Sequence, residues 1–328
     1  MTSAAPVFDT EAIRLEWREA RGGHPSTATM NLIVYVENER YRDWVFERAQ
    51  RIADKHPSRM IVLDAVKGEH GTKITAELPR ADAPFRERVK LGVDGIRAPQ
   101  RVQFVEALVV KDVPLVLWWA ADRLFSSETF KGLLDIVGHI ILDSSGTDKE
   151  PNAIREFASF FSGTQNAALN DLAWMRLDPW RDVVAQFFDD PGMRDELFAI
   201  HNVSVSSGSD SEALYLGGWL ASRLGWSVRD GSSFADPNGA AIPFERKREG
   251  DIRRVRSITL ESASSKYRAY VEGDDAVCLE VTGKFSRPDR HVPLQAIDNT
   301  SLVERAILDE RTDEIFMEAL HTVGELLK

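Results

Sequence analysis

Residues Thr29–Val36 read TMNLIVYV, a nearly continuous apolar run that is typical of a strand covered on both faces. The following segment, Arg40–Lys55, repeats apolar residues at helical spacing and ends at His56-Pro57. Residues Arg59–Asp64, RMIVLD, then predict a second strand. A strand, a helix and a strand joined by short links predict a right-handed βαβ unit, and this unit sets the fold class of the first half.

The rest of the first half continues the alternation of strands and helices. Val113–Trp119 is the firmest of the later strands, whereas Val102–Val110 is apolar enough for either a buried helix or a strand. The alternation predicts a three-layer α/β domain, which we place at residues 1–168. The other expected elements are a helix at Asp9–Ala20, a hairpin arm at Gly68–Pro79, a helix from Ser127 to Ile136, a strand at Gly138–Asp143 and a helix at Pro151–Ser162.

The second half has a different pattern, with strands that follow one another directly. Asp230–Gly250 is rich in glycine and proline, and we expect a solvated loop there, with a docking arm as the alternative. Gly217-Gly218 inside a helical segment predicts close packing against another element. We expect an α+β domain at residues 169–328. Its elements are helices at Pro179–Asp190 and Ala213–Leu224, a strand at Ile200–Ser206, an antiparallel meander of Ile252–Glu261, Lys266–Glu272 and Ala276–Thr282, a protected edge at Arg287–Arg290, and two closing helices, the first capped by Ser301 and Glu304.

Composition and charge exclude several classes of function. The net charge is −11, which argues against nucleic-acid binding because phosphate contacts need a basic face. No apolar run approaches the roughly 20 residues of a membrane-spanning helix, and the first residues lack the pattern of a signal peptide. We therefore expect a cytoplasmic protein with no membrane partner.

Metal and cofactor sites have little support in the residue pattern. The single cysteine, Cys278, lies in an apolar run, which predicts a buried inert thiol and excludes an intramolecular disulfide and a cysteine-based metal site. The histidines are scattered, and none lies four residues from another. We expect no metal and no cofactor.

The first half lacks the sequence motifs of nucleotide-binding enzymes. No G-x-G-x-x-G follows its first strand, and no G-x-x-x-x-G-K-[ST] occurs. Asp64 and Asp143 end strands, where open α/β sheets often bind ligands, but such carboxylates also cap loops. His139 lies among strand residues, which favours a hydrogen-bonded core position. These residues do not identify a catalytic site, and we expect none.

A polar loop in the second half has two interpretations. Ser207, Gly208 and Ser209 follow a strand and precede a helix, an arrangement that can bind an anion at backbone N–H groups. Ser209 and Glu212 also have the spacing of a capping box, in which the helix start satisfies itself. The acidic Asp210 and Glu212 would repel a phosphate, which favours the self-capped helix.

Between the two halves lies DLAWMRLDPWR, residues Asp171–Arg181. Tryptophan and arginine are enriched where proteins bind each other tightly, which suggests a binding segment. Alternatively, both tryptophans belong to the core and Asp178-Pro179 begins a helix, with Asp178 as its N-cap and Pro179 at the first helical position. The candidate residues are Trp174, Arg176, Asp178, Trp180 and Arg181.

The spelling of this segment resembles the glucose-6-phosphate dehydrogenase assembly protein family (OpcA). Members carry D-L-[AS]-W-x-R-L-x-P-W-R, which residues Asp171–Arg181 match throughout. An upstream D-x-P-x-x-x-W-W strand is matched from Asp112 to Trp119, and an H-P-x-R turn is matched by His56–Arg59. The segment is the specific part of the resemblance, which weakens after about residue 230.

The resemblance implies a non-catalytic accessory subunit that binds glucose-6-phosphate dehydrogenase of the bacterial oxidative pentose phosphate pathway and activates it allosterically. The five candidate residues would then contact the enzyme or hold the two domains together, with Trp118 and Trp119 as supporting core. A competing hypothesis is an enzyme or sensor that binds a phosphorylated sugar through residues Ser206–Ser211. A third is a structural scaffold that does not change the enzyme's turnover.

Overall fold

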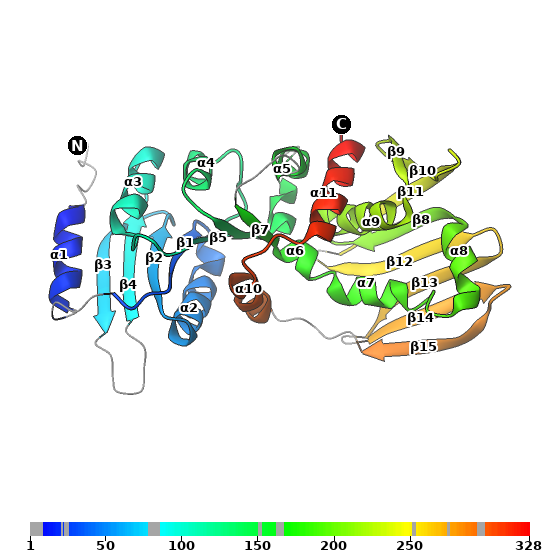
Figure 1. Ribbon diagram of the computed structural model, residues 1–328, viewed down its shortest axis with the longest axis horizontal. Helices are drawn as coiled ribbons and strands as arrows, with labels where there is room; N and C mark the ends of the chain where they lie inside the picture. The colour runs from blue at the N-terminus through cyan, green and yellow to red at the C-terminus, as the bar shows by residue number, and fades with distance from the viewer. Residues whose placement is uncertain are drawn as a thin grey trace. The chain divides into compact units, whose positions relative to one another are not determined.

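The computed structural model contains two compact units. Unit 1 comprises Met1–Asp143, Asn166–Asn170 and Val303–Arg311, and unit 2 comprises Ser144–Gln165, Asp171–Leu302 and Thr312–Lys328 (Figure 1). The structure describes residues 9–20, 22, 26–77, 86–149, 153–161, 167–250, 254–273, 276–293 and 299–328. Within these residues, every helix is too short or too polar to cross a membrane.

Unit 1 is built on a seven-stranded sheet with the order β3-β4-β2-β1-β5-β6-β7. Strands β4, β2, β1, β5 and β6 run parallel, and β3 is antiparallel to β4. Helix α2 lies on one face, and helices α3 and α4 lie on the other (Figure 1). The three-layer α/β fold is thus confirmed. Its elements are α1 (Thr10–Ala20), β1 (Met30–Val36), α2 (Glu39–Lys55), β2 (Ser58–Asp64), β3 (His70–Glu77), β4 (Arg86–Val93), α3 (Ala98–Leu108), β5 (Leu115–Ala120), α4 (Glu128–Leu134), β6 (His139–Leu142) and β7 (Ala168–Asp171).

The centre of this sheet is excluded from solvent, because β1 is buried along its whole length. Trp118 and Trp119 on β5 are 2% and 1% exposed, so their expected core role is confirmed. The ambiguous segment Val102–Val110 lies mostly in helix α3, with Phe104, Val105 and Leu108 buried. The expected hairpin arm is β3, and its partner β4 had not been anticipated.

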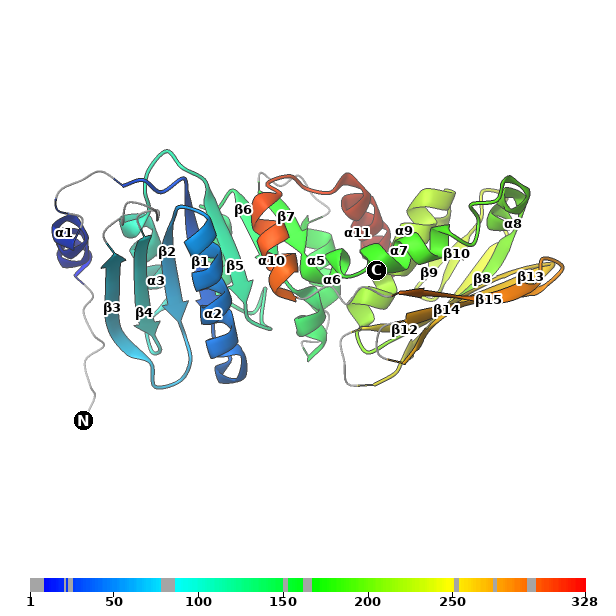
Figure 2. The same ribbon diagram turned by 90° about the horizontal axis from the view of Figure 1, so that it is seen from below.

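Unit 2 is built on an eight-stranded sheet with the order β15-β14-β13-β12-β8-β11-β10-β9. Helices α7, α8 and α9 lie together on one face of this sheet (Figure 2). The expected three-stranded meander is confirmed as β12, β13 and β14, and the expected edge at Arg287–Arg290 lies in β15, the outermost strand of the sheet. The elements are α5 (Ala153–Phe161), α6 (Leu172–Met175), α7 (Asp178–Ala185), α8 (Arg194–Phe198), β8 (Ile200–Ser207), α9 (Asp210–Leu224), β9 (Ser227–Asp230), β10 (Ser233–Ala235), β11 (Ala241–Arg248), β12 (Val255–Ser262), β13 (Ser265–Glu272), β14 (Ala276–Gly283), β15 (Arg287–Pro293), α11 (Glu314–Leu326) and the 3₁₀ turns η1 (Ser144–Lys149) and η2 (Pro191–Met193). Helix α10 (Asn299–Leu308) is divided between the two units, because Val303–Arg311 belong to unit 1.

The expectation of a solvated loop at Asp230–Gly250 is wrong. Strand β11 pairs parallel with β8, and its side chains Ile242 and Phe244 are buried. The two buried residues alternate with exposed ones, as in a strand with one covered face. Pro243 and the charged residues that follow obscured this short alternation in the sequence.

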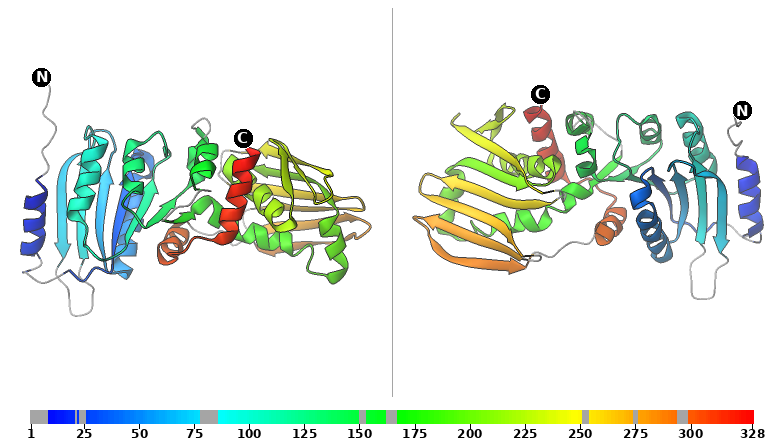
Figure 3. Two further views of the ribbon diagram at one scale, coloured as in Figure 1. Left: turned by 45° about the horizontal axis from the view of Figure 1, so that its top comes forward. Right: turned by 180° about the vertical axis from the view of Figure 1, so that it is seen from behind.

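Helix α9 lies between the sheet and α11, and Figure 3 shows α11 beside it from two directions. The expected close packing at its two glycines is confirmed. A Cβ atom at Gly217 would lie 2.4 Å from the Phe244 ring, and one at Gly218 would lie 2.5 Å from the Ala319 carbonyl oxygen. The expected cap of the first closing helix is wrong, because α10 begins at Asn299 and already contains Ser301.

Candidate functional site

The tryptophan-arginine segment, residues Asp171–Arg181, forms the short helix α6 and the start of α7 within unit 2. Asp171 caps α6, because its carboxylate accepts the Ala173 N–H at 2.9 Å. The expectation that Asp178 caps the next helix is wrong by one position. Helix α7 begins at Asp178, and Leu177 occupies the cap without a side-chain hydrogen bond. Asp178 instead places a negative charge in the first turn, which the helix dipole favours.

Trp174 is a core residue of unit 2. Its side chain is 2% exposed and stacks on Phe316 of α11, with the ring centroids 5.2 Å apart. The indole Nε1 donates a hydrogen bond to Asp313 Oδ2 at 2.8 Å. Asp313 also caps α11 by accepting the Ile315 N–H at 2.8 Å. Trp174 therefore ties α6 to the start of α11 through both its apolar ring and its one polar group.

Arg181 covers the outer side of this tryptophan. Its guanidinium carbon lies 3.8 Å from the centroid of the Trp174 ring, a cation–π contact. One guanidinium nitrogen donates to the Trp174 carbonyl oxygen at 3.1 Å, and the other is paired with Asp178. The Arg181 side chain is 15% exposed and that of Asp178 is 34% exposed. Asp178 is thus the most accessible charged side chain of the segment.

Arg176 forms a buried ion pair with Glu212 of α9. Its Nε donates to Glu212 Oε1 at 2.9 Å, and the two side chains are 11% and 1% exposed. A second guanidinium nitrogen donates to Ser145 Oγ at 2.8 Å. The pair therefore connects the segment, η1 and α9 by charge-assisted hydrogen bonds, which are stronger than neutral ones.

A second buried cluster lies next to this pair. The Tyr215 hydroxyl donates to Asp171 Oδ2 at 2.7 Å and is hydrogen-bonded to Ser144 Oγ at 3.0 Å. The Ser144 N–H donates to Asp171 Oδ1 at 3.0 Å, and Ser211 Oγ donates to the Ser144 carbonyl at 3.2 Å. A buried carboxylate needs such partners because its desolvation is otherwise costly. Asp171 thus organises η1, α6 and α9 around one point.

The five sequence-derived candidates therefore belong to unit 2, where Trp174 and Trp180 are 2% and 4% exposed. Their hydrogen bonds and ion pairs described above all remain within that unit. The structure places the aromatic rings inside and leaves the edge of Asp178 outside. The segment is therefore largely interior, and its most exposed charged side chain is that of Asp178.

The Ser207–Ser209 loop is largely occupied by its own hydrogen bonds. The Gly208 N–H donates to the Arg254 carbonyl at 3.1 Å, and the Ser209 N–H donates to Ser207 Oγ at 3.1 Å. Ser207 Oγ in turn donates to Glu212 Oε2 at 3.4 Å. Two N–H groups of the predicted anion site are therefore already used within the protein.

The expected capping box at this loop is wrong. Ser209 occupies the cap of α9, but its side chain makes no capping hydrogen bond. Glu212 points to Arg176 and Ser207, away from the helix start. The reason is electrostatic, because a buried carboxylate gains more from a guanidinium than from a backbone N–H.

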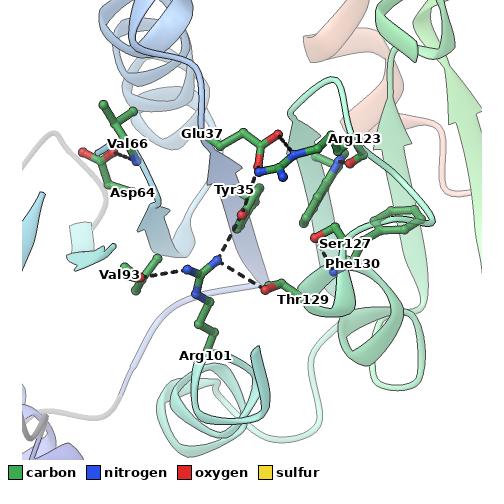
Figure 4. Close-up of polar contacts among 11 residues, drawn as sticks. Tyr35, Glu37, Asp64, Val66, Val93, Arg101, Arg123, Ser127, Thr129 and Phe130 are labelled. Atoms are coloured by element: carbon green, nitrogen blue, oxygen red, sulfur yellow. Dashed lines mark hydrogen bonds and ion pairs between the residues drawn. The ribbon is translucent and has the colours of Figure 1, made fainter. Parts of the chain in front are cut away.

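A third polar cluster lies at the carboxyl ends of the strands in unit 1 (Figure 4). The sheet order reverses between β1 and β5, and open α/β sheets bind their ligands at such a point. Glu37 follows β1, and its carboxylate accepts two hydrogen bonds from Arg123, at 3.1 and 2.9 Å. This bidentate pair joins the residues that follow β1 and β5.

Arg101 of α3 makes several hydrogen bonds to the same cluster. It donates to the Tyr35 hydroxyl at 3.1 Å, to Thr129 Oγ1 at 3.3 Å and to the Val93 carbonyl at 2.9 Å (Figure 4). Tyr35 stacks flat on Trp119, with the ring centroids 3.9 Å apart. Burial, reinforced by the charge of Glu37, raises the pKa of Tyr35 to about 12. The hydroxyl is therefore protonated at neutral pH and serves as a structural group.

These residues do not fit a dinucleotide of the kind that doubly wound folds bind. The turn from β1 to α2 reads Val36-Glu37-Asn38-Glu39 and has no glycine to let a pyrophosphate approach the backbone. The Asn38 side chain caps α2 by accepting the Arg40 N–H at 3.0 Å. Glu37 and Glu39 place negative charge at the helix start that would otherwise attract phosphate.

The strand-end residues considered from sequence have structural partners. Asp64 is fully buried and paired with Arg42 and Lys90, each at 2.8 Å, and it accepts the Val66 N–H at 3.3 Å. His139 is 3% exposed and hydrogen-bonded through Nε2 to Asn170 at 3.2 Å, as expected for a core histidine. Burial lowers the pKa of His139, which keeps the ring neutral.

Sequence reasoning missed Arg101, Tyr215 and Glu212 as organising residues. Glu212 and Tyr215 lie among apolar residues of α9, and a polar group that becomes buried requires a partner, so this signal can be read in the sequence. Arg101 gives no such signal, because α3 also carries Gln100, Gln103 and Glu106. The partners Tyr35, Asp171 and Arg176 lie 66, 44 and 36 residues away, and only the fold identifies them.

Two family models match the chain in order along its length. Residues 49–159 match the glucose-6-phosphate dehydrogenase subunit N-terminal domain, and residues 167–320 match the corresponding C-terminal domain. The chain is 29% identical over 188 residues to the OxPP cycle protein OpcA of Nostoc punctiforme, covering 54% of this chain and 40% of the relative. It is 31% identical over 125 residues to the OpcA protein of Synechocystis, covering 38% and 26%. The matches thus span less than half of these curated relatives.

Solved structures show the same kind of fold in oxidoreductases. A 3-ketoreductase from Actinomadura kijaniata, KijD10, in complex with TDP-benzene and NADP, superposes with a TM-score of 0.51 at 11% identity, covering 91% of this chain and 95% of that chain. A levoglucosan dehydrogenase in complex with NADH and L-sorbose superposes with a TM-score of 0.52 at 11% identity, covering 92% and 96%. At this identity the likeness concerns the fold alone.

Proposed function

Because the chain belongs to the OpcA family of glucose-6-phosphate dehydrogenase assembly proteins, we propose that it binds glucose-6-phosphate dehydrogenase as a non-catalytic partner and activates it. The observation that carries this proposal is the ordered match of both subunit domains, over residues 49–159 and 167–320. Two consecutive domains of one family support a shared role for the whole segment.

Activation of this kind works by differential binding. A partner raises the enzyme's activity when it binds the active conformation or oligomer more tightly than the inactive one. A preference of roughly 100-fold shifts that equilibrium by about 2.7 kcal/mol. The partner needs no reactive group for this effect, only a surface of fixed shape.

The strand-end cluster of unit 1 supports a non-catalytic role. The likeness to NADP- and NADH-bound reductases makes a dinucleotide site the natural alternative for this fold. Glu37, Asn38 and Glu39 replace the glycine-rich turn that such a site uses, and Glu37 is held by Arg123. This chemistry disfavours a bound pyrophosphate.

The buried contacts of the tryptophan-arginine segment fix the shape of the surface that would bind a partner. Trp174 and Arg176 join α6 to α11 and α9 through contacts that a partner does not have to supply. A preorganised surface binds more tightly because less conformational freedom is lost on association. On this proposal Trp174 and Arg176 act as positioning residues, whereas Asp178 and Arg181 lie at the surface where a partner docks.

The proposal is tested by mixing the purified chain with glucose-6-phosphate dehydrogenase from the same organism. Initial rates of NADPH formation and the mass of the complex are measured as the chain is titrated. We expect a saturable rise in rate together with a larger species. A complex without a change in rate would favour a scaffold, and no complex at all would refute the proposed partner.

The competing phosphosugar hypothesis is tested with the chain alone. Glucose 6-phosphate and 6-phosphogluconate are titrated against the native chain and against Ser207→Ala. We expect no turnover and no binding that depends on Ser207, because two N–H groups of that loop are already occupied. Turnover by the chain alone would overturn the non-catalytic assignment.

A further inference from the structure

Three side chains with metal-binding atoms converge on the meander of unit 2. Glu272 on β13, Cys278 on β14 and His291 on β15 each offer one ligand atom, and these atoms lie within 4.8 Å of one another. Cys278 is buried, whereas Glu272 and His291 are exposed. Among the described residues, this is the group in which different metal-ligating chemistries meet.

The strand register explains why the three meet. Cys278 is directly paired with His291 on one side and with Tyr270 on the other, so these side chains share a face of the sheet. Glu272 lies two residues beyond Tyr270 on β13 and therefore points to the same face. His291 Nδ1 already lies 2.8 Å from Glu272 Oε2. The three donors come from three neighbouring strands of one antiparallel ladder.

Tyr270 is directly paired with Cys278 across β13 and β14, so its side chain lies beside the thiol on the same face of the sheet. Cys278 is 1% exposed, whereas the side chains of Glu272 and His291 are 53% and 56% exposed. The two exposed side chains are therefore able to rotate toward the buried thiol.

The donor set selects the class of ion. A thiolate, an imidazole and a carboxylate together suit Zn²⁺, whereas Ca²⁺ and Mg²⁺ require oxygen ligands. Zn–S and Zn–N distances place tetrahedral ligand atoms about 3.5 Å apart. The three ligand atoms now lie within 4.8 Å of one another, so they must move closer together by about 1 Å to bind one zinc ion. Rotation of the exposed side chains supplies this shift.

We propose that Glu272, Cys278 and His291 form a zinc site that joins β13, β14 and β15, with the fourth position open to water. Binding replaces the thiol proton, so one proton leaves Cys278 as the Zn–S bond forms. Composition alone dismissed a cysteine-based site because the chain has one cysteine. The fold supplies the other two ligands from neighbouring strands. The proposal is independent of the partner enzyme.

The test uses the full chain, purified with a thiol-free reductant and stripped of metal. Zinc affinity and stoichiometry are measured by competition with a chromophoric chelator, and Co²⁺ is then bound as a spectroscopic substitute. We expect one zinc per chain and a thiolate-to-cobalt charge-transfer band. His291→Gln should weaken zinc binding by roughly 100-fold, since loss of even an outer partner costs about 10–100-fold. Cys278→Ser should abolish the charge-transfer band.

The chain offers a matched control in His321 of α11, whose Nε2 atom lies 3.7 Å from Glu325 Oε1. Among the described residues, this histidine–glutamate pair is not part of a three-ligand group with a thiol. His321→Gln should leave zinc affinity unchanged. Glu272→Gln keeps the test valid if Cys278→Ser, at a buried position, fails to fold. Zinc binding that His291→Gln does not weaken, a cobalt spectrum without the thiolate band, or no binding by the native chain would each overturn the site.

Discussion

Replacing Arg176 by methionine should destabilise unit 2 and leave unit 1 unchanged. The substitution keeps a long apolar stem but removes the guanidinium that lies 2.9 Å from Glu212 Oε1. Glu212 is 1% exposed, so its carboxylate stays buried in the variant, and the 3.4 Å hydrogen bond from Ser207 is among the contacts that it keeps. The variant therefore removes the opposite charge that faces a buried carboxylate.

The expected magnitude follows from the separation and burial of the pair. At 2.9 Å and an effective dielectric constant of ~20, the attraction amounts to about 6 kcal/mol. Part of this is offset because methionine, unlike arginine, has no charge to desolvate. Breaking a buried pair by removing one partner costs about 3–5 kcal/mol, and we expect a loss in that range. Replacing both residues by methionine should recover more than about half of the loss, since an apolar pair leaves no buried charge.

The assay is hydrogen exchange followed by mass spectrometry, with urea unfolding in parallel. Peptides from β8 and α9 should exchange on the order of 10²–10³-fold faster in Arg176→Met, because each 1.4 kcal/mol is a factor of ten. Peptides from β1 and β2 of unit 1 serve as the internal control. Arg311→Met, whose native side chain is 91% exposed, should change stability by less than about 0.5 kcal/mol. Equal effects of Arg176→Met and Arg311→Met would show that the buried ion pair between Arg176 and Glu212 does not stabilise unit 2.

Three further substitutions probe the packing and charge of unit 2. Gly218→Ala should cost about 1–3 kcal/mol in urea unfolding despite its better helix propensity, because the new Cβ would lie 2.5 Å from the Ala319 carbonyl oxygen. Hydrogen bonds from Ser262 and Ser264 lower the pKa of Glu196, so its stabilising effect is complete above its unfolded pKa and is lost as the pH falls through the folded pKa. Glu196→Gln should therefore lower the free energy of unfolding at pH 7, measured with urea, by about 1 kcal/mol, and this difference from the native chain should shrink below about pH 4.5. Trp174→Phe should cost about 1–2 kcal/mol by removing the Nε1 hydrogen bond to Asp313, and circular dichroism melting checks this value.

Each of these predictions has its own contrary result. Gly138→Ala, where a Cβ meets nothing within 4 Å, should be tolerated, and an equal loss there would discount the close α9–α11 packing. A difference for Glu196→Gln that persists unchanged into acid would show that its hydrogen bonds do not depend on charge. A Trp174→Phe chain as stable as the native one would mean that its hydrogen bond contributes little.

Local sequence pattern was sufficient for the centre of unit 1. Strands β1 and β2 are buried along their whole length, so they appear in the sequence as continuous apolar runs. Helix α2 repeats its apolar residues at Val45, Ala49 and Ile52, and these three are buried together with Ala53. Where burial is continuous or strictly periodic, the fold class follows from the residues alone.

Pattern failed where pairing is distant or where charge competes with capping. Strand β11 has only two buried residues, Ile242 and Phe244, and its parallel pairing with β8 is a long-range contact. The predicted capping box is absent because Glu212 forms an ion pair with Arg176, which lies 36 residues away in the sequence. The sequence left the two candidate tryptophans as either binding residues or core residues, and only the structure shows that both are buried. These features depend on which distant residues the fold brings together.

The most direct test of the central claim is the initial rate of NADPH formation by glucose-6-phosphate dehydrogenase as this chain is titrated. We expect the rate to rise and to saturate at a fixed molar ratio, while the chain alone forms no NADPH. A rate that stays flat across the titration would contradict the proposed activation, and NADPH formed by the chain without the dehydrogenase would contradict its non-catalytic role.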